Sequence, residues 1–322
     1  AVRAAEVVRQ LLAFGRRQVR QLEPLDLDGV VADLMKMLHR LIGEHITLEV
    51  IAKPGLPPVY ADRTQLDQIL VNLCVNARDA MPDGGRLTIE TGYAELDENF
   101  AATHSWAKPG PHVVLSVTDT GCGIDPEIAD HIFEPFFTTK AVGEGTGLGL
   151  ATIYGIVRQH EGMITCYSEP GVGTTFKIHL PAAGLPLADD EAERKAEPQG
   201  GHETILLAED DTDVRTMTEL LLRKAGYKVL VAADGQEAED LLARHGGDID
   251  LALLDVVMPR KGGREIHDAL KVTHPDMPVL FSSGYSINAI HNDFILQRDM
   301  KLIEKPYSQN DLLRRVRELL DA

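Results

Sequence analysis

The sequence predicts an α/β protein of two domains, the second built on a doubly wound, five-stranded parallel sheet. Residues 181–203 are rich in Pro, Gly, Ala and acidic residues and lack apolar periodicity, which indicates a linker. After it, five short apolar runs alternate with amphipathic segments, the pattern of a parallel sheet with helices on both faces. Before it, the glycine-rich loop GEGTGLGLA runs into an apolar segment that is typical of a helix.

Composition excludes several classes of function. The 322 residues are enough for two domains, and a net charge of -18 without a basic stripe argues against nucleic acid as a direct partner. No apolar run has the length of a membrane span, so we expect no membrane contact by these residues. Cys74, Cys122 and Cys166 show no paired or metal-binding spacing, which fits packing residues in a reducing, cytoplasmic environment.

The N-terminal segment shows helical periodicity. Apolar residues recur with three-then-four spacing from residue 5 to residue 22, which predicts a helix that packs against other helices and ends at Pro24. An amphipathic surface helix fits the same spacing. Because the chain has neither an initiator Met nor a signal-peptide pattern, we expect an excised fragment.

The loop at residues 143–151 is a candidate anion site. The Walker pattern needs Lys and Ser or Thr after its last glycine, but Leu150 and Ala151 follow here, and the dinucleotide fingerprint has a different glycine order. The backbone N–H groups of the loop and the positive end of a helix from Leu148 attract negative charge. A glycine hinge without a ligand remains the alternative.

An apolar helix at residues 66–77 carries two amides on one face. Asn72 and Asn76 are four residues apart, so they can reach a metal ion and its phosphates together. A solvated pair of Asn residues is the alternative.

A strand at residues 113–118 ends at a carboxylate. Asp119 can accept a hydrogen bond from an exocyclic amine, and Gly121 and Gly123 allow a flat ring to lie against the backbone. By itself this pattern is also a common turn.

Taken in order, NLCVNA, DTGCGI, FEPFFTTK, GTGLGLA and GVGTTF resemble the N, G1, F, G2 and G3 boxes of the histidine-kinase catalytic domain, a member of the gyrase-type ATPase superfamily. The resemblance covers residues 25–182 and implies an α/β sandwich with a mixed sheet that holds Mg-ATP under a lid. It implies that Asp119 meets the adenine amine near Thr174, and that Asn76 holds Mg²⁺ with help from Asn72. It further implies nucleotide contacts from Gly121, Gly123, Gly145, Gly147, Leu148, Gly149 and Leu150.

One position departs from that family. Many such kinases carry Lys three residues after the second Asn of the N box, but Asp79 stands here, and an acid cannot neutralise phosphate. Arg78 beside it and Lys140 in the expected lid are the candidate phosphate contacts. A surface helix residue is the alternative for Arg78.

In the second domain, acidic residues follow the predicted strands. Glu209, Asp210 and Asp255 fall at strand ends, where the crevice of a parallel sheet lies. Three adjacent carboxylates repel one another unless a cation joins them, and oxygen ligands favour Mg²⁺. Each could also be a cap or a loop acid, as we expect of Asp211.

The second half, residues 203–322, resembles a response-regulator receiver domain through AEDD, LLDVVMP, FSSG and EKPY. The resemblance implies that Asp255 is the phosphoacceptor, that Glu209 and Asp210 bind Mg²⁺ together with Asp255, and that Ser283 and Lys305 contact the phosphoryl group. Leu302 stands where many receivers have an aromatic switch residue, which argues against an output through an aromatic rotamer.

Together the halves resemble the C-terminal part of a hybrid sensor histidine kinase, with residues 1–24 as the end of the dimerisation hairpin and residues 183–202 as the linker. None of the twelve His residues fits the phosphoacceptor box of that family, and His160 is interpreted as structural. We therefore expect a relay from ATP to a histidine upstream of this fragment and then to Asp255.

This interpretation implies several partners: ATP, a histidine-containing dimerisation domain, and a downstream histidine phosphotransfer protein or response regulator. It also implies a homodimeric full-length protein whose membrane anchor, where it has one, lies upstream. Two alternatives remain open. One is a receiver-bearing regulatory or phosphatase module whose ATP site only controls docking. The other is an ATP-driven clamp, against which the receiver half argues.

Overall fold

The computed structural model describes most of the chain and divides it into two compact units, Ala1–Ala94 with Pro111–Leu187, and Glu95–Gly110 with Ala188–Ala322. The expected N-terminal helix and most of the expected linker lie outside the described residues. The described residues are 21–96, 108–140, 145–183, 200–284, 300–305 and 307–321.

The first unit contains a mixed sheet in the order β2-β4-β5-β7-β6. Strand β2 runs parallel to β4, whereas β7 is antiparallel to both β5 and β6. A short antiparallel pair, β1 and β3, forms a second sheet that a single bridge from Val59 to Ala182 links to the end of β7, and Pro24 lies within β1. The strands are β1 (Glu23–Leu25), β2 (Ile46–Ile51), β3 (Val59–Ala61), β4 (Gly85–Leu96), β5 (Gly110–Asp119), β6 (Met163–Glu169) and β7 (Gly173–Pro181).

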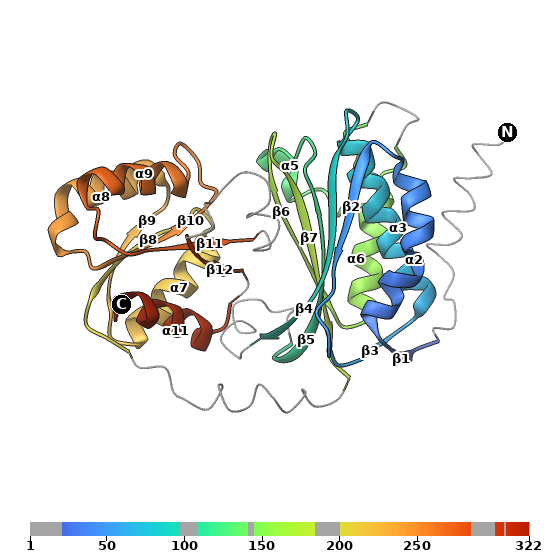
Figure 1. The fold of residues 1–322 in the computed structure, drawn as a ribbon, viewed down its shortest axis with the longest axis horizontal. Helices are drawn as coiled ribbons and strands as arrows, with labels where there is room; N and C mark the ends of the chain where they lie inside the picture. Colours follow the sequence, from blue (N-terminus) through green and yellow to red (C-terminus); the bar gives the residue numbers. More distant parts are fainter. Residues whose placement is uncertain are drawn as a thin grey trace. The chain divides into compact units, whose positions relative to one another are not determined.

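Three helices cover one face of this sheet (Figure 1). Asp26 and Asp62 cap the first two, because their carboxylates accept from the N–H groups of Asp28 at 3.2 Å and of Thr64 at 2.9 Å. A short helix, α5 (Pro126–Ala129), follows β5. The covering helices are α2 (Leu27–Ile42), α3 (Arg63–Ala80) and α6 (Gly149–Gln159).

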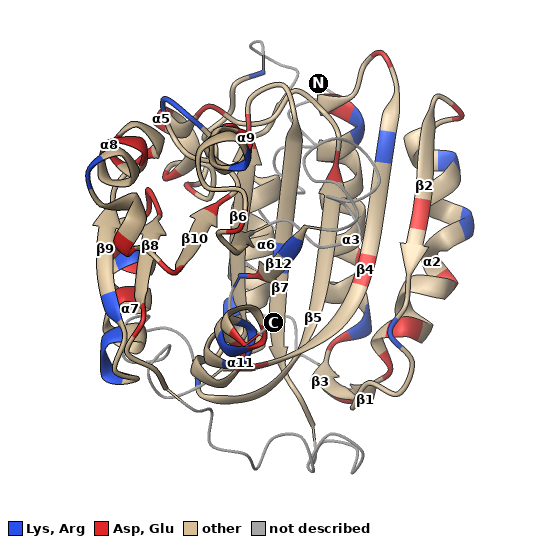
Figure 2. Ribbon diagram, turned by 60° about the vertical axis from the view of Figure 1, so that its left-hand side comes forward, with Lys and Arg blue, Asp and Glu red and all other residues tan. Residues whose placement is uncertain are grey.

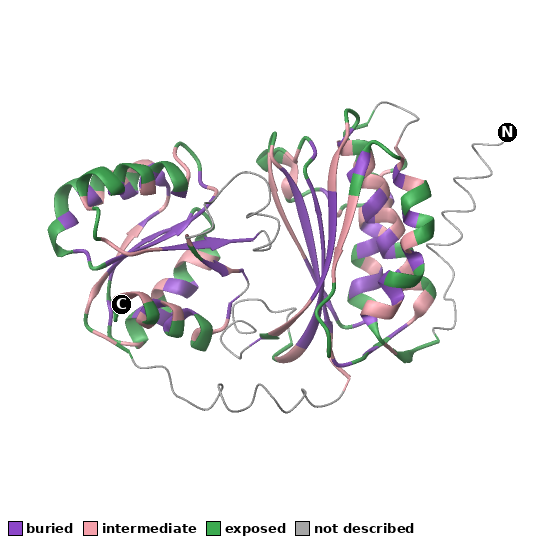
Figure 3. Ribbon diagram, viewed as in Figure 1, coloured by how far each residue is buried: buried purple, intermediate pink, exposed green. Residues whose placement is uncertain are grey.

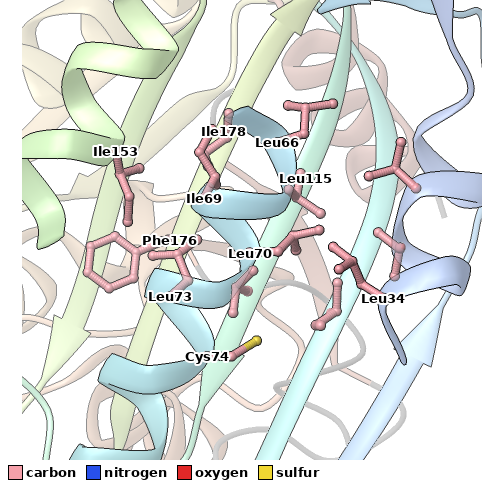
Figure 4. Close-up of a cluster of buried hydrophobic side chains, with 14 of the residues drawn as sticks. Leu34, Leu66, Ile69, Leu70, Leu73, Cys74, Leu115, Ile153, Phe176 and Ile178 are labelled. Carbon is pink, nitrogen blue, oxygen red and sulfur yellow. The ribbon is translucent and has the colours of Figure 1, made fainter. Parts of the chain in front are cut away.

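The core of the first unit lies between these helices and the sheet. Leu70 and Leu73 of α3 pack with Leu115 of β5 and Ile178 of β7, all fully buried (Figure 4). Burial follows the helical and strand periodicities, so the helices are buried on the sheet side and exposed on the other (Figure 3). This packing fixes the end of β5 beside the last turn of α3, where the first candidate site lies.

The second unit is a parallel sheet in the order β12-β11-β10-β8-β9. Helices α8 and α9 lie on one face and α7 and α11 on the other (Figure 1). The strands are β8 (Thr204–Ala208), β9 (Lys228–Ala232), β10 (Leu251–Asp255), β11 (Val279–Ser283) and β12 (Lys301–Glu304); the helices are α7 (Thr212–Lys224), α8 (Gly235–His245), α9 (Gly263–Thr273) and α11 (Gln309–Leu320). The predicted fold class, a mixed-sheet unit followed by a doubly wound parallel sheet, is confirmed.

The strands of the second unit are apolar on both sides, as a doubly covered sheet requires. Leu206, Leu254 and Phe281 are fully buried in a cluster on one face. Acidic residues gather where β8 and β10 end (Figure 2). Within the described parts of the chain, none of the helices has the length and apolar content that a membrane-spanning helix needs.

Candidate functional site

The first candidate site begins at Asp119, the last residue of β5. Asp119 is buried opposite Thr174 of β7, and its Oδ1 accepts a hydrogen bond from the N–H of Gly121 at 2.9 Å. Burial raises the pKa of Asp119 to about 6, although the hydrogen bonds from the backbone of Gly121 and Thr174 oppose the shift. A buried carboxylate with an oxygen to spare can accept from a ligand amine.

The two glycines that follow allow close backbone packing. A side chain at Gly121 would lie 2.7 Å from the carbonyl oxygen of Ala80, and Gly123 has a φ of +71° and packs on the carbonyl of Glu169. Both positions therefore exclude side chains, because neighbouring parts of the chain fill the space that a Cβ would need.

Ser168 supports this site although the sequence did not single it out. Its Oγ accepts from the N–H of Ile124 at 2.8 Å, lies 2.8 Å from Oγ1 of Thr174, and donates to the carbonyl of Gly173 at 3.0 Å. It therefore joins the glycine segment after β5 to β7. The only signal for this role is the register that places Ser168 opposite Thr174, and register is visible only in the folded sheet.

The glycine-rich loop ends at the N-terminus of α6. Leu148 is the N-cap residue and provides no side-chain hydrogen bond to the helix, so the first N–H groups, those of Gly149 and Leu150 among them, are not capped by it. Gly147 has a φ of +64°, and its carbonyl accepts from the N–H of Phe136 at 2.8 Å. The positive end of α6 thus follows a backbone turn that only glycine adopts easily, which suits an anion. Gly145 also lies in this loop, and a side chain there would lie 2.5 Å from Oγ1 of Thr138 and 3.2 Å from Cβ of Lys140.

The amides and the candidate cations lie along α3 and beside its C-terminal end. Asn72 and Asn76 are half-buried and share one face of the helix. Arg78 and Lys140 both contact Asp79: Nη2 of Arg78 lies 2.7 Å from Oδ1, and Nζ of Lys140 lies 2.5 Å from Oδ2. The structure therefore brings both predicted phosphate contacts to one acid.

The second candidate site is the cluster at the strand ends of the second unit. Ligand oxygens of Glu209, Asp210 and Asp255 all lie within 4.8 Å of one another. Nζ of Lys305 lies 2.7 Å from Oδ2 of Asp255 and 2.8 Å from Oε1 of Glu209. Three hard oxygen donors at this spacing match the ligand chemistry of Mg²⁺, so these residues fit such an ion.

The charged groups of this cluster shift one another's pKa values. Burial, and then the charge of Asp255, raise the pKa of Glu209, and the same two causes raise that of Asp210. Burial alone would lower the pKa of Lys305, but the carboxylates of Asp255 and Glu209 outweigh it and raise that pKa. Lys305 thus stays an ammonium, and its single positive charge does not neutralise the three carboxyl groups of the cluster.

Ser283 lies at the end of β11, next to the cluster in the sheet. It is buried, and its carbonyl accepts from the backbone N–H of Lys305 at 2.7 Å. The strand register places its neighbour Ser282 opposite Asp255. Leu302 of β12 is buried in the apolar cluster that contains Leu254 and Phe281.

Arg215 of α7 was not predicted as a site residue. Its Nη1 donates to the backbone carbonyls of Glu209 at 2.7 Å and Asp210 at 2.8 Å, so it holds the acidic segment after β8. Its sequence signal is only an Arg one turn into a helix, which is too common to identify the role.

His160 and Cys122 lie in different surroundings, the first buried and the second exposed. His160 is buried, its Nδ1 lies 2.9 Å from the carbonyl of Ile156, and its Nε2 accepts from the N–H of Asp62 at 3.0 Å. Its structural interpretation is confirmed. The interpretation of all three cysteines as packing residues is wrong for Cys122, which is exposed in the glycine segment after β5.

Comparison with family models matches both units. Residues 61–184 match the histidine kinase-, DNA gyrase B-, and HSP90-like ATPase family, and residues 205–317 match the response regulator receiver domain family. The candidate residues of each site fall within these ranges.

Individual relatives resemble the chain over one or both units. The sensor kinase CckA of Brucella abortus is 43% identical over 329 residues, which cover 100% of this chain and 35% of that protein. The signal transduction histidine-protein kinase AtoS of Escherichia coli is 35% identical over 178 residues, which cover 55% of this chain and 26% of that protein. A crystal structure of full-length ShkA in complex with AMPPNP aligns over 99% of this chain and 90% of that chain, with a TM-score of 0.46 and 19% identity. The chain thus spans about a third or less of the length of these curated relatives.

Proposed function

Because the chain belongs to the hybrid sensor histidine kinases, we propose that its first unit binds Mg-ATP and phosphorylates a histidine on a dimerisation domain, and that its second unit accepts the phosphoryl group on Asp255. The observation that carries the proposal is the pairing of Lys305 with Asp255 beside two further carboxylates, in the same chain as an ATPase domain. We also propose the expected domain limits, residues 25–182 and 203–322.

In the first unit, the proposed roles follow from the chemistry of each side chain. Asp119 accepts from the adenine amine, near Thr174, and the backbone of Gly121 and Gly123 lies against the ring. Asn76, with Asn72, supplies amide oxygens to Mg²⁺. The loop of Gly145, Gly147, Leu148, Gly149 and Leu150 binds phosphate oxygens through its N–H groups. ATP supplies the transferable γ-phosphoryl group.

In the second unit, Asp255 is the nucleophile. One of its carboxylate oxygens forms a bond to the phosphorus of a phosphohistidine while the bond from phosphorus to the imidazole nitrogen breaks, and the histidine is released. Lys305 offsets the charge on the transferring oxygens, and Ser283 provides a hydroxyl to the same group. Glu209, Asp210 and Asp255 would hold Mg²⁺, which supplies further positive charge there.

The experiment uses the purified chain, γ-labelled ATP and a separate dimerisation hairpin that contains the phosphoacceptor histidine. We expect negligible label on the chain alone, since direct transfer would need both phosphate sites to share one in-line geometry. With the hairpin, an acid-labile phosphohistidine should appear first and an aspartyl phosphate second. Asp255→Asn should stop the second step alone, whereas the matched exposed control Asp213→Asn should not.

Two outcomes would contradict the proposal. Label on the isolated chain that persists in Asp255→Asn would mean that another residue accepts phosphate directly. ATP binding without transfer to the hairpin would favour the alternative, a regulatory or phosphatase module whose ATP site only controls docking. The homodimer and the downstream histidine phosphotransfer protein or response regulator are part of the proposal and follow from the relay.

A further inference from the structure

Asp79 is the residue at which the first unit departs from the expected pattern, and its carboxylate is shared by two cations. Oδ2 accepts from Nζ of Lys140 at 2.5 Å, and Oδ1 accepts from Nε and Nη2 of Arg78 at 3.0 and 2.7 Å. Lys140 is 61 residues away in sequence, so the acid joins the C-terminal end of α3 to the loop after residue 137. The N–H···O bonds are charge-assisted, which favours the ionised form of Asp79.

The two cations differ in what else they bind. Arg78 also donates from Nη1 to the carbonyl of Leu41 at 3.1 Å, in the last turn of α2. All three guanidinium nitrogens of Arg78 therefore have protein acceptors, and the side chain joins α3 to α2. Lys140 is an ammonium on a flexible stem whose side chain is 37% exposed, and its ion pair is with Asp79. Of the two, Lys140 can change partner at smaller cost.

The position of Asp79 on the helix decides where that ammonium is held. Asp79 follows Asn76 by three residues, so the two side chains are neighbours on the surface of α3. Lys140 is therefore held within one helical turn of an amide proposed to bind the metal of the nucleotide. Burial alone would raise the pKa of Asp79, but Lys140 and Arg78 outweigh it and lower that pKa.

We propose that Asp79 is a positioning residue: its carboxylate holds the ammonium of Lys140 beside Asn76 and releases it to the terminal phosphate when ATP binds. Arg78 keeps its own contacts and continues to link α3 to α2. This inference rests on the proposed function, because it assigns the phosphate contact of the same ATP site. A partly exposed ion pair is weak, and a phosphate group carries more charge and more acceptor oxygens than a carboxylate. Exchange of Asp79 for phosphate is therefore favourable.

The test is a double-mutant cycle on nucleotide affinity, measured by calorimetry on the whole chain. Asp79→Asn should bind ATP about two- to fivefold more tightly, because the competing anion is lost. Lys140→Met should bind ATP more weakly, and in its background Asp79→Asn should have no effect. AMP, which has no terminal phosphate, should bind equally well to Asp79→Asn and to the unaltered chain. Asp79→Glu should keep the unaltered behaviour.

A second measurement does not need nucleotide. Amide hydrogen exchange of residues 131–140 in the chain without nucleotide should be faster in Asp79→Asn and in Lys140→Met, because each removes the anchor of that loop. The matched control is Asp83→Asn, which removes an equal charge from an exposed residue close to the end of α3. It should change neither exchange nor affinity.

The outcomes separate this inference from the proposed function. If the unaltered chain binds ATP but Asp79→Asn weakens binding, or strengthens it equally in the Lys140→Met background, Asp79 does not compete for Lys140 and the inference is wrong. If exchange of residues 131–140 is the same in every variant, the pair does not anchor the loop and the inference is wrong. If the unaltered chain does not bind ATP at all, the proposed function fails and this inference fails with it.

Discussion

The ammonium of Lys305 lies 2.7 Å from the carboxylate of Asp255, although 50 residues separate the two in sequence. Both are buried, and the same ammonium lies 2.8 Å from Oε1 of Glu209. The strand order explains the contact, since the carboxyl ends of β8, β10, β11 and β12 lie at the same end of a parallel sheet. In the proposed reaction, the nucleophile Asp255 and a cation that offsets the charge on the transferring oxygens are thus in place before a phosphodonor arrives.

Replacing Lys305 by Met should slow phosphorylation of Asp255 by acetyl phosphate about a hundredfold, since the charge on the transferring oxygens loses its partner. Intact-mass spectrometry over time gives the rate. Lys301→Met is the matched control, because Lys301 is exposed at the start of β12. Equal rates for Lys305→Met and the unaltered chain would exclude the proposed role of Lys305.

Mg²⁺ should raise the temperature of unfolding of the second unit. The carboxylates of Glu209, Asp210 and Asp255 repel one another, and a cation that binds only the folded state stabilises it by an amount that rises with the cation concentration. Differential scanning calorimetry with Mg²⁺ and with a chelator measures the shift. In Asp210→Asn most of the shift should disappear, whereas Asp213→Asn should keep it; the same Mg²⁺ response in both would place the ion elsewhere.

Asp119→Ala should weaken ATP binding about ten- to a hundredfold, because the adenine amine loses a buried acceptor. Calorimetric titration checks this, with Asp83→Asn as the control for a simple loss of charge. Unchanged affinity in Asp119→Ala would show that the adenine site lies elsewhere.

The affinity for ATP should fall as the pH falls through about 6, the pKa to which burial raises Asp119. A protonated carboxyl is a poorer acceptor for the adenine amine, so binding is strongest above that pH. Stability should respond with the opposite sign. Between an ordinary value of 3.8 and about 6 the folded chain binds a proton that the unfolded chain does not, so the free energy of unfolding contributed by Asp119 rises as the pH falls.

Asp119→Asn, which cannot titrate at this position, should lose the fall in ATP affinity and the contribution of Asp119 to the pH dependence of stability. Urea unfolding and ATP titration between pH 5 and about 8 measure them. A pH dependence of affinity that Asp119→Asn retains would assign the titration to another group.

Gly123→Ala should destabilise the first unit by more than about 1 kcal/mol, because its φ of +71° disfavours a side chain and the carbonyl of Glu169 occupies the space. Gly155→Ala is the matched control, since its position in α6 is open and alanine favours helix, so it should stabilise by about 0.5–1 kcal/mol. Urea unfolding of both variants checks the pair. If Gly123→Ala left the free energy of unfolding unchanged, the segment after β5 would have to move aside at little cost.

The sequence predicted the fold class and the elements that carry the sites, because strand periodicity and glycine-rich turns are local signals. It placed Asp119 at a strand end and Asp255 in a cluster with Glu209, since the ends of parallel strands meet. It did not predict the contacts of Ser168 and Arg215, which depend on strand register and on where a helix side chain reaches.

The interaction of Lys140 with Asp79 shows the same limit. Both residues were noted in the sequence, one as a candidate phosphate contact and the other as an acid where a lysine was expected. Only the packing of the loop on α3 joins them, and no spacing rule covers a separation of 61 residues. The exposure of Cys122 was missed for a related reason, since a glycine segment can turn a small apolar residue outward.

Strand β12 has four residues and is an outermost strand of the second sheet, where it pairs with β11. The side chain of Lys305, directly after it, reaches past β11 to acids at the ends of β10 and β8. These ion pairs hold the outer strand β12 to the inner strands, in addition to its backbone hydrogen bonds to β11. We expect a chemical change at Asp255 to alter these ion pairs, and therefore to loosen the outer strand of the sheet and not its centre.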